Sequence, residues 1–263
     1  MAILCDIAGN RIGSIHRNNG VLMEYGVYNG AHYWLARIIR KDIGDGKTIV
    51  KPKLLIGEGT GLKGATLAEE NDYTMILNAG LFSESSGQVQ CAGTTIREGA
   101  VVSDRRWAGV DQNTEYSRAE VLCIDETGMM FTSDYSIPAQ EMADIGVYNA
   151  VQGFGTIIKD GALADFDALK TALGQFAHVV TNPGARNIIG QFGNGDYLIF
   201  STGEIGNHDG GLNMQDIGEL LLTKGATFAY NLDGGNSTCL FYGKTDLAYY
   251  GTARKIPSVF VFE

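Results

Sequence analysis

The sequence predicts an α+β fold, a single compact domain with a mixed or antiparallel β-sheet core and a few packed helices. Three observations lead to this prediction. Glycine accounts for 36 of the 263 residues and proline for only 4, which is typical of strands joined by tight turns. Several short apolar runs end at a glycine turn signal such as Glu98-Gly99 or Asp160-Gly161. Few segments have helical periodicity, and no Pro/Ser-rich segment divides the chain.

The first half of the chain is predicted to consist mainly of strands. Residues 23–40 are alternating and rich in aromatic residues, which favours strand structure, and residues 62–71 are a short helix candidate. The other predicted elements are an apolar strand at 74–77 and two hairpins with glycine turns. One hairpin pairs 93–96 with 100–103, and the other pairs 121–125 with 129–131. The apolar strand leads directly into Asn78.

The second half contains the clearest helix, at residues 213–224. Asn213 can cap it, Met214, Ile217 and Leu221 lie on one face, and Gly225 ends it. The other predicted elements are a strand at 149–159, a helix at 165–174 capped by Asp165, a hairpin of 187–191 with 197–201, and a strand at 227–232. We expect the apolar face of the 213–224 helix to pack on the sheet that these strands form with 74–77.

Composition and charge exclude several classes of partner. Hydrophobic residues make up 44% of the chain, enough for a core, and the net charge of −10 argues against binding to nucleic acid. No apolar run is long enough to span a membrane. Residues 1–10 do not read as a secretory signal, so we expect a cytoplasmic or virion-associated protein, and a secreted one only if a leader was removed.

The four cysteines are far apart in the sequence, which favours buried free thiols over a metal site or disulfides. They are Cys5, Cys91, Cys123 and Cys239.

The strongest chemical signal is the segment YNLDGGNST, which ends at residue 238. A buried strand ends in the carboxylate of Asp233, and Gly234 and Gly235 then allow the backbone to approach a ligand closely. The polar residues that follow, Asn236 and Ser237 among them, can donate hydrogen bonds to an anion. A tight turn in which Asp233 only accepts backbone amides is the alternative.

Five segments of the chain, in the same order, resemble the motifs of the phosphodiester glycosidase family. They are NAGLF at 78–82, GFGTIIKDG at 153–161, ARNIIG at 185–190, GLNMQDIGEL at 211–220 and NLDGGNST at 231–238. The last is similar to the family's NLDGGGS, with Asn236 in place of the third glycine. Ala79 and Leu81 depart from the family's NGGFF, and Glu204 stands where the family often has arginine. The resemblance implies one such domain over 1–263, with the motif-bearing core at about 74–262 and residues 1–73 integrated as N-terminal strands and a short helix.

The resemblance also implies a reaction, the hydrolysis of a sugar joined through its anomeric carbon to a phosphodiester. The leaving group is a phosphate monoester, so a strong general acid is less necessary than in ordinary glycosidases. Arg186 suits binding of the phosphate, because its planar guanidinium matches two phosphate oxygens; a surface salt bridge is the alternative. Asp233 suits a position near the anomeric carbon, where it would stabilise positive charge or activate water.

Further residues are substrate-binding candidates. Asn78 can hold a sugar hydroxyl or a phosphate oxygen, or form a local turn. Asn231 alternates with Asp233 along one strand, so both side chains can face the same side, and a buried core amide is the alternative. Gly155 and Thr156 belong to the family's glycine strand. We expect Asn78, Gly155, Arg186, Asn231 and Asp233 to converge on one pocket.

Two residues of a glycine-rich segment complete the candidate site. Glu204 is either a second carboxylate or an exposed turn residue, and His208 is either an acid/base or a loop histidine. His208 and Asp209 have no regular ligand spacing, so we expect neither a metal nor another cofactor. The sequence leaves two functions to be distinguished, a hydrolase and a binding module.

The first is a hydrolase of sugar-1-phosphodiesters, such as a capped glycan or a teichoic-acid-like polymer. The second is a non-catalytic glycan- or phosphoglycan-binding module, for example a phage tail or surface protein. The presence of both Arg186 and Asp233, which binding alone would not require, favours the enzyme.

Overall fold

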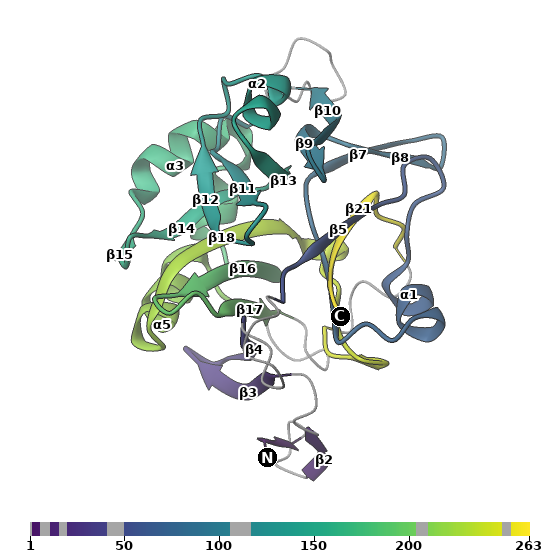
Figure 1. Cartoon of the computed structure of the whole chain (residues 1–263). Helices are drawn as coiled ribbons and strands as arrows, with labels where there is room; N and C mark the ends of the chain where they lie inside the picture. Colours follow the sequence, from purple (N-terminus) through teal and green to yellow (C-terminus); the bar gives the residue numbers. More distant parts are fainter. Residues whose placement is uncertain are drawn as a thin grey trace.

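Antiparallel sheets covered by short helices make up the structure, a computed structural model (Figure 1). It describes residues 2–5, 11–15, 20–40, 50–105, 117–203, 210–248 and 254–263. Within these ranges every strand pairing is antiparallel. The predicted α+β fold is confirmed.

A seven-stranded sheet in the order β15-β14-β18-β16-β17-β4-β3 forms the largest layer. Its strands are β3 (Val21–Tyr28), β4 (Ala31–Ile38), β14 (Gly155–Lys159), β15 (Ala162–Leu163), β16 (Arg186–Phe192), β17 (Tyr197–Thr202) and β18 (Ala226–Gly234). The predicted hairpin of β16 and β17 is confirmed, and it lies between β18 and the N-terminal hairpin of β3 and β4.

Two five-stranded sheets and two ribbons complete the β structure. One sheet consists of β9 (Gly93–Arg97), β10 (Ala100–Arg105), β11 (Val121–Asp125), β12 (Met130–Ser133) and β13 (Val147–Gln152). The other consists of β5 (Lys53–Ile56), β6 (Met75–Asn78), β19 (Leu240–Tyr242), β20 (Thr245–Asp246) and β21 (Ser258–Phe262). The ribbons are β1 (Ala2–Cys5) with β2 (Arg11–Ile15), and β7 (Phe82–Ser85) with β8 (Gln88–Cys91).

Short helices cover the sheets on their outer faces. They are α1 (Gly64–Glu70), α2 (Ala139–Asp144), α3 (Phe166–Leu173), α4 (His178–Thr181) and α5 (Met214–Thr223), with 3-10 turns η2 (Gly174–Phe176) and η3 (Gly235–Ser237). Helix α5 begins where predicted, because the Asn213 side chain accepts a hydrogen bond from the Asp216 amide at 2.8 Å. Its residues Met214, Ile217 and Leu221 are fully buried, in one apolar cluster with residues of β14, β16 and β18. The predicted packing of this helix on the sheet of β14, β16 and β18 is confirmed. The expectation that strand 74–77 belongs to the same sheet is wrong, because β6 lies in one of the five-stranded sheets.

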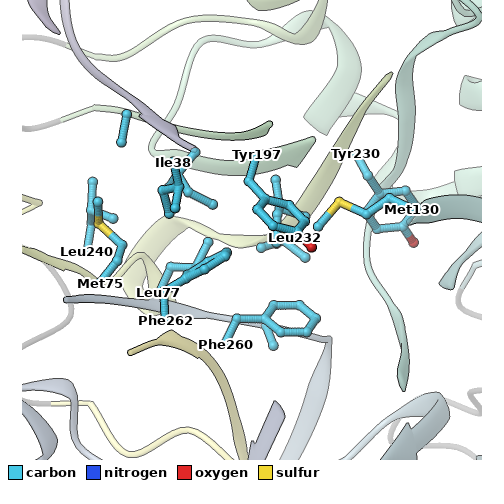
Figure 2. Close-up of a cluster of buried hydrophobic side chains, with 14 of the residues drawn as sticks. Ile38, Met75, Leu77, Met130, Tyr197, Tyr230, Leu232, Leu240, Phe260 and Phe262 are labelled. Atoms are coloured by element: carbon cyan, nitrogen blue, oxygen red, sulfur yellow. The ribbon is translucent and has the colours of Figure 1, made fainter. Parts of the chain in front are cut away.

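The main core lies between the seven-stranded sheet and the sheet that contains β6 and β21 (Figure 2). Its large, fully buried side chains come from both layers and include Tyr197, Tyr230, Leu77, Phe260 and Phe262. Burying one such side chain contributes about 1.5–3 kcal/mol to folding. The Tyr197 and Tyr230 hydroxyls donate to the carbonyls of Gly128 at 2.9 Å and Glu120 at 2.7 Å. This core therefore packs the two sheets against each other, and the two hydroxyl hydrogen bonds link the seven-stranded sheet to the segments on either side of β11.

One predicted strand, at residues 149–159, is wrong. The chain divides there into β13 and β14, which belong to different sheets. The backbone of Gly153 lies so close to β18 that a Cβ would be 2.5 Å from the carbonyl oxygen of Asn231, and Gly155 has φ +98°. Because both positions require glycine, the chain can change direction between the two sheets.

The other predicted helices and hairpins agree with the structure to within a few residues at each end. Residues 23–40 are a hairpin, β3 with β4. The thiols of Cys91, Cys123 and Cys239 are free and buried, as expected, whereas the side chain of Cys5 lies outside the described residues. None of the described helices is long and apolar enough to cross a membrane.

Gly190, in the middle of β16, offers a test of this sheet. An added Cβ would lie 2.1 Å from the carbonyl oxygen of Phe228, so Gly190→Ala must push β16 and β18 apart. We expect the free energy of unfolding to fall by about 3 kcal/mol in denaturant titrations. Gly210→Ala is the control, since no atom of the described residues lies within 4 Å of its added Cβ, and it should change stability by less than about 1 kcal/mol. Equal effects of the two substitutions would contradict the packing described.

Candidate functional site

Asn78 joins the five-stranded sheet that contains β6 to the seven-stranded sheet that contains β18, at the point where these two strands end. Its Nδ2 donates to the carbonyl oxygen of Asp233 at 2.7 Å, and its Oδ1 accepts from Asn187 Nδ2 at 2.6 Å and from the Cys239 amide at 3.0 Å. Asn187 also donates to the Cys239 carbonyl at 2.7 Å. With 1% of its surface exposed, Asn78 makes these contacts with protein groups and fixes the backbone of Asp233.

A β-bulge in β18 sets the direction of the Asp233 side chain. Asn231 pairs with Ile188 and Gly234 with Arg186, so Leu232 and Asp233 both lie opposite Asn187. A bulge interrupts the alternation of side chains along a strand and often redirects one beside a site. The simple alternation expected from the sequence therefore does not decide whether Asn231 and Asp233 face the same side.

The loop after Asp233 folds back onto the beginning of β16. The Gly235 amide donates to the Ala185 carbonyl at 2.9 Å, and a Cβ on Gly234 would lie 2.7 Å from the same oxygen. Ser237, at the end of η3, is buried, whereas Asn236 is exposed. The two glycines thus allow the loop to pass close to β16 and leave Asn236 accessible.

Asp233 is a carboxylate enclosed by protein on most sides, and part of the residue remains exposed. Burial raises its pKa from the ordinary 3.8 to about 6. Hydrogen bonds from the Ser237 hydroxyl and the Gly234 amide, the latter at 2.9 Å, and the charges of Arg254 and Arg186 act in the opposite direction. Asp233 is therefore mostly ionised at pH 7 and can take up a proton within one pH unit below that.

Arg186 is the first residue of β16 and lies opposite Gly234. Its Nη1 donates to the Ala185 carbonyl at 2.9 Å, and its Nη2 donates at 3.2 Å to the carbonyls of Val179 and of Asn182. Burial lowers the pKa of Arg186 to about 10 and the charge of Asp233 opposes this effect, so the side chain stays cationic at pH 7. The residue is 7% exposed, and the guanidinium Nε has no hydrogen-bond partner among the described residues.

Arg254 is a site residue that the sequence analysis did not identify. Its Nη1 donates to Ser237 Oγ at 3.2 Å, and its guanidinium carbon lies 4.8 Å from the centre of the Phe82 ring. It also forms an ion pair with Glu84, with 3.6 Å between Nη2 and Oε2. A single arginine before the final strand carries no sequence signal of its own. Only its contact with the NLDGG loop reveals it.

Within the described chain, the hydrogen bonds to the Asp233 carboxylate come from Ser237 and Gly234, and the remaining candidates contribute none. Gly155 pairs with Asn231, and an added Cβ there would lie 2.6 Å from Leu169, so its role is in packing. Thr156 donates to Glu120 at 2.5 Å. Thr156 also lines a cavity of about 310 Å³ between β14 and α3. Asn78, Arg186, Asp233 and Arg254 do not line this cavity. Asn231 is fully buried, and neither amide atom has a hydrogen-bond partner within the described chain.

The structure thus brings together Asn78, Arg186, Asp233 and Ser237 and adds Arg254. Glu204, His208 and Asp209 lie outside the described residues. Within the described ranges, no group of three or more His, Cys, Asp or Glu side chains is placed to hold a metal ion.

Comparisons with known proteins agree on one family and fold. The model of the phosphodiester glycosidase family matches residues 71–263. No curated protein matches in sequence. The fold is similar to the catalytic domain of zebrafish N-acetylglucosamine-1-phosphodiester alpha-N-acetylglucosaminidase auto-inhibited by its pro-peptide, with a TM-score of 0.69 at 16% identity over 98% of this chain and 91% of that one.

Two further solved structures share the fold. A hypothetical protein from Synechocystis has a TM-score of 0.64 at 15% identity over 92% of this chain and 62% of that one. A protein of Burkholderia pseudomallei K96243, described as exported, has a TM-score of 0.58 at 11% identity over 88% of this chain and 74% of that one.

The raised pKa of Asp233 predicts a pH-dependent effect on stability. Because the folded chain binds this proton more tightly than the unfolded chain, the folded state loses stability as pH rises from about 4 to about 6. Asp233→Asn removes that loss. We expect the variant to unfold with a free energy about 3 kcal/mol higher than wild type at pH 8 and nearly equal at pH 4. Denaturant titrations at both pH values measure the difference, and a less stable variant at pH 8 would contradict it.

Proposed function

Because the chain belongs to the phosphodiester glycosidase family, we propose that it hydrolyses the bond between the anomeric carbon of a sugar and a phosphodiester. The observation that carries this proposal is Asp233, a carboxylate with a pKa of about 6 at the end of a core strand, within electrostatic reach of two arginines. We take an N-acetylglucosamine-1-phosphodiester as the first substrate to test, since the zebrafish protein of similar fold is named for that compound.

In the proposed reaction, the oxygen of a water molecule forms a bond to the anomeric carbon. The bond from that carbon to the phosphate oxygen breaks, and its electron pair leaves with the phosphate monoester. The proton of the attacking water passes to Asp233 and then to solvent. Because a phosphate monoester is a good leaving group, no protein acid has to protonate it, and one carboxylate is sufficient.

Arg186 supports the reaction through its charge. It is held by three backbone carbonyls and stays positively charged, so it offsets the negative charge of Asp233 and of an incoming phosphodiester. Asn78 is a positioning residue in this scheme, since it binds the Asp233 backbone rather than its carboxylate.

Asp233→Asn should slow the chemical step by about 10²–10⁴-fold, because the amide keeps the shape of the side chain but neither stabilises positive charge nor accepts a proton. The wild-type rate should rise with pH through about 6 and then level off, as Asp233 loses its proton, and the residual rate of the variant should lack this step. Single-turnover hydrolysis of the sugar-1-phosphodiester between pH 4 and 8 measures both effects.

Asp134→Asn, in the exposed turn after β12, is the matched control and should keep the wild-type profile. If Asp233→Asn also kept it, the catalytic carboxylate would lie elsewhere, with Glu204 the next residue to test. A wild-type protein that binds the diester and cleaves none would favour the glycan-binding module.

Arg186→Lys should weaken both binding and turnover of the diester, each by about tenfold or more. Lysine keeps the charge, but a single ammonium cannot reproduce the planar set of donors that bonds three carbonyls. Arg97→Lys, at the exposed last residue of β9, is the control. Unfolding curves of both variants separate a lost site from a lost fold, and an Arg186→Lys variant with wild-type kinetics would rule out this role.

A further inference from the structure

Arg254 occupies an accessible position at the site, between two carboxylates. Its side chain is 39% exposed, and the Phe82 ring lies against its guanidinium. On one side it reaches Ser237, whose hydroxyl in turn bonds the Asp233 carboxylate. On the other side is Glu84, whose nearest oxygen is 3.6 Å away, too far for a hydrogen bond. The ring and the serine therefore orient the guanidinium, and Glu84 binds it only loosely.

The two arginines differ in what their donors already do. Arg186 is almost fully buried and donates to three backbone carbonyls. Arg254 makes one hydrogen bond of 3.2 Å and one loose ion pair with the described residues. A phosphate needs an exposed guanidinium that can exchange weak contacts for two short charge-assisted hydrogen bonds. Arg254 meets this requirement and Arg186 does not.

We propose that Arg254 binds the phosphate of the substrate and that Glu84 limits this position to a phosphate carrying a single negative charge. The proposal rests on the proposed function and names the charge class of substrate at the same site. Among the described residues, Arg186 and Arg254 balance Asp233 and Glu84 in charge. Arg254 can therefore exchange its loose contact with Glu84 for one phosphate charge, whereas a second negative charge would lie unpaired beside Glu84.

This balance distinguishes the substrate from its product. A phosphodiester carries one negative charge, whereas a phosphate monoester carries about 1.5 to 2 at neutral pH. Once the bond to the sugar breaks, the added charge lies beside Glu84 and is repelled. The site therefore accepts diesters, discriminates against sugar 1-phosphates and releases the monoester product.

Dimethyl phosphate and methyl phosphate form a matched pair of probes, since they differ by one methyl group and one ionisable oxygen. Each is titrated at pH 8 and low salt while the backbone amide signals of Gly234 and Ser237 are followed by NMR. Wild type should bind dimethyl phosphate more tightly than methyl phosphate. Glu84→Gln should bind methyl phosphate about fivefold more tightly than wild type does and change little toward dimethyl phosphate. Arg254→Gln should bind both at least tenfold more weakly.

Two controls come from another exposed pair, Arg97 and Glu98, whose nearest charged atoms lie 3.9 Å apart. Glu98→Gln and Arg97→Gln should leave both affinities unchanged. Unfolding curves identify any variant that has lost its fold, and Arg254→Lys, which keeps the charge but loses the planar group over Phe82, then serves in place of Arg254→Gln.

If Arg254→Gln binds both anions like wild type, or wild type binds neither, Arg254 is not the phosphate ligand. If Glu84→Gln leaves the ratio of the two affinities unchanged, Glu84 does not set the charge limit. Hydrolysis is measured separately. A wild type that binds dimethyl phosphate through Arg254 and cleaves no sugar-1-phosphodiester contradicts the proposed function and supports the anion site. A wild type that cleaves the diester as fast as its Arg254→Gln variant overturns this inference alone.

Discussion

The amide of Asn78 is the contact on which the site depends, because it ties the end of one sheet to the end of another. It bonds the backbone of Asp233 and accepts from Asn187 and Cys239, all within 3.0 Å. Asn78 lies in the sheet of β6 and β21, and Asp233 in the seven-stranded sheet. A side chain of this geometry, buried among polar partners, is costly to replace. It fixes where the β18 bulge lies relative to the loop that follows β6.

The position of Asp233 costs stability and provides reactivity. Burial favours the neutral acid, while two arginines, a serine and a backbone amide favour the carboxylate, and the first effect is larger. A group that loses its proton near pH 6 is ionised at neutral pH and still basic enough to take a proton from water. The same compromise explains why an active-site carboxylate can be replaced with a gain in stability and a loss of function.

Local patterns predicted much of this fold from the sequence. The Asn213 cap and the glycine-turn hairpins formed as expected, because each depends on residues close together in the chain. The motifs also led us to expect Arg186 and Asp233 at one site, and the charges of these two residues do act on one another. The sequence could not indicate the change of sheet at Gly153, which depends on the approach of β18, or the bulge at Asp233. Arg254 was missed because its partners, Phe82, Glu84 and Ser237, are distant in the sequence.

This fold holds Asp233 as a carboxylate of raised pKa within electrostatic reach of two arginines. The most direct measurement is a pH titration of the Asp233 side-chain carboxyl carbon by NMR in the wild-type protein, with the signal assigned by comparison with Asp233→Asn. We expect a midpoint at about 6. A midpoint at or below the ordinary aspartate value of about 3.9 would show that the arginines and hydrogen bonds outweigh burial, and would contradict it.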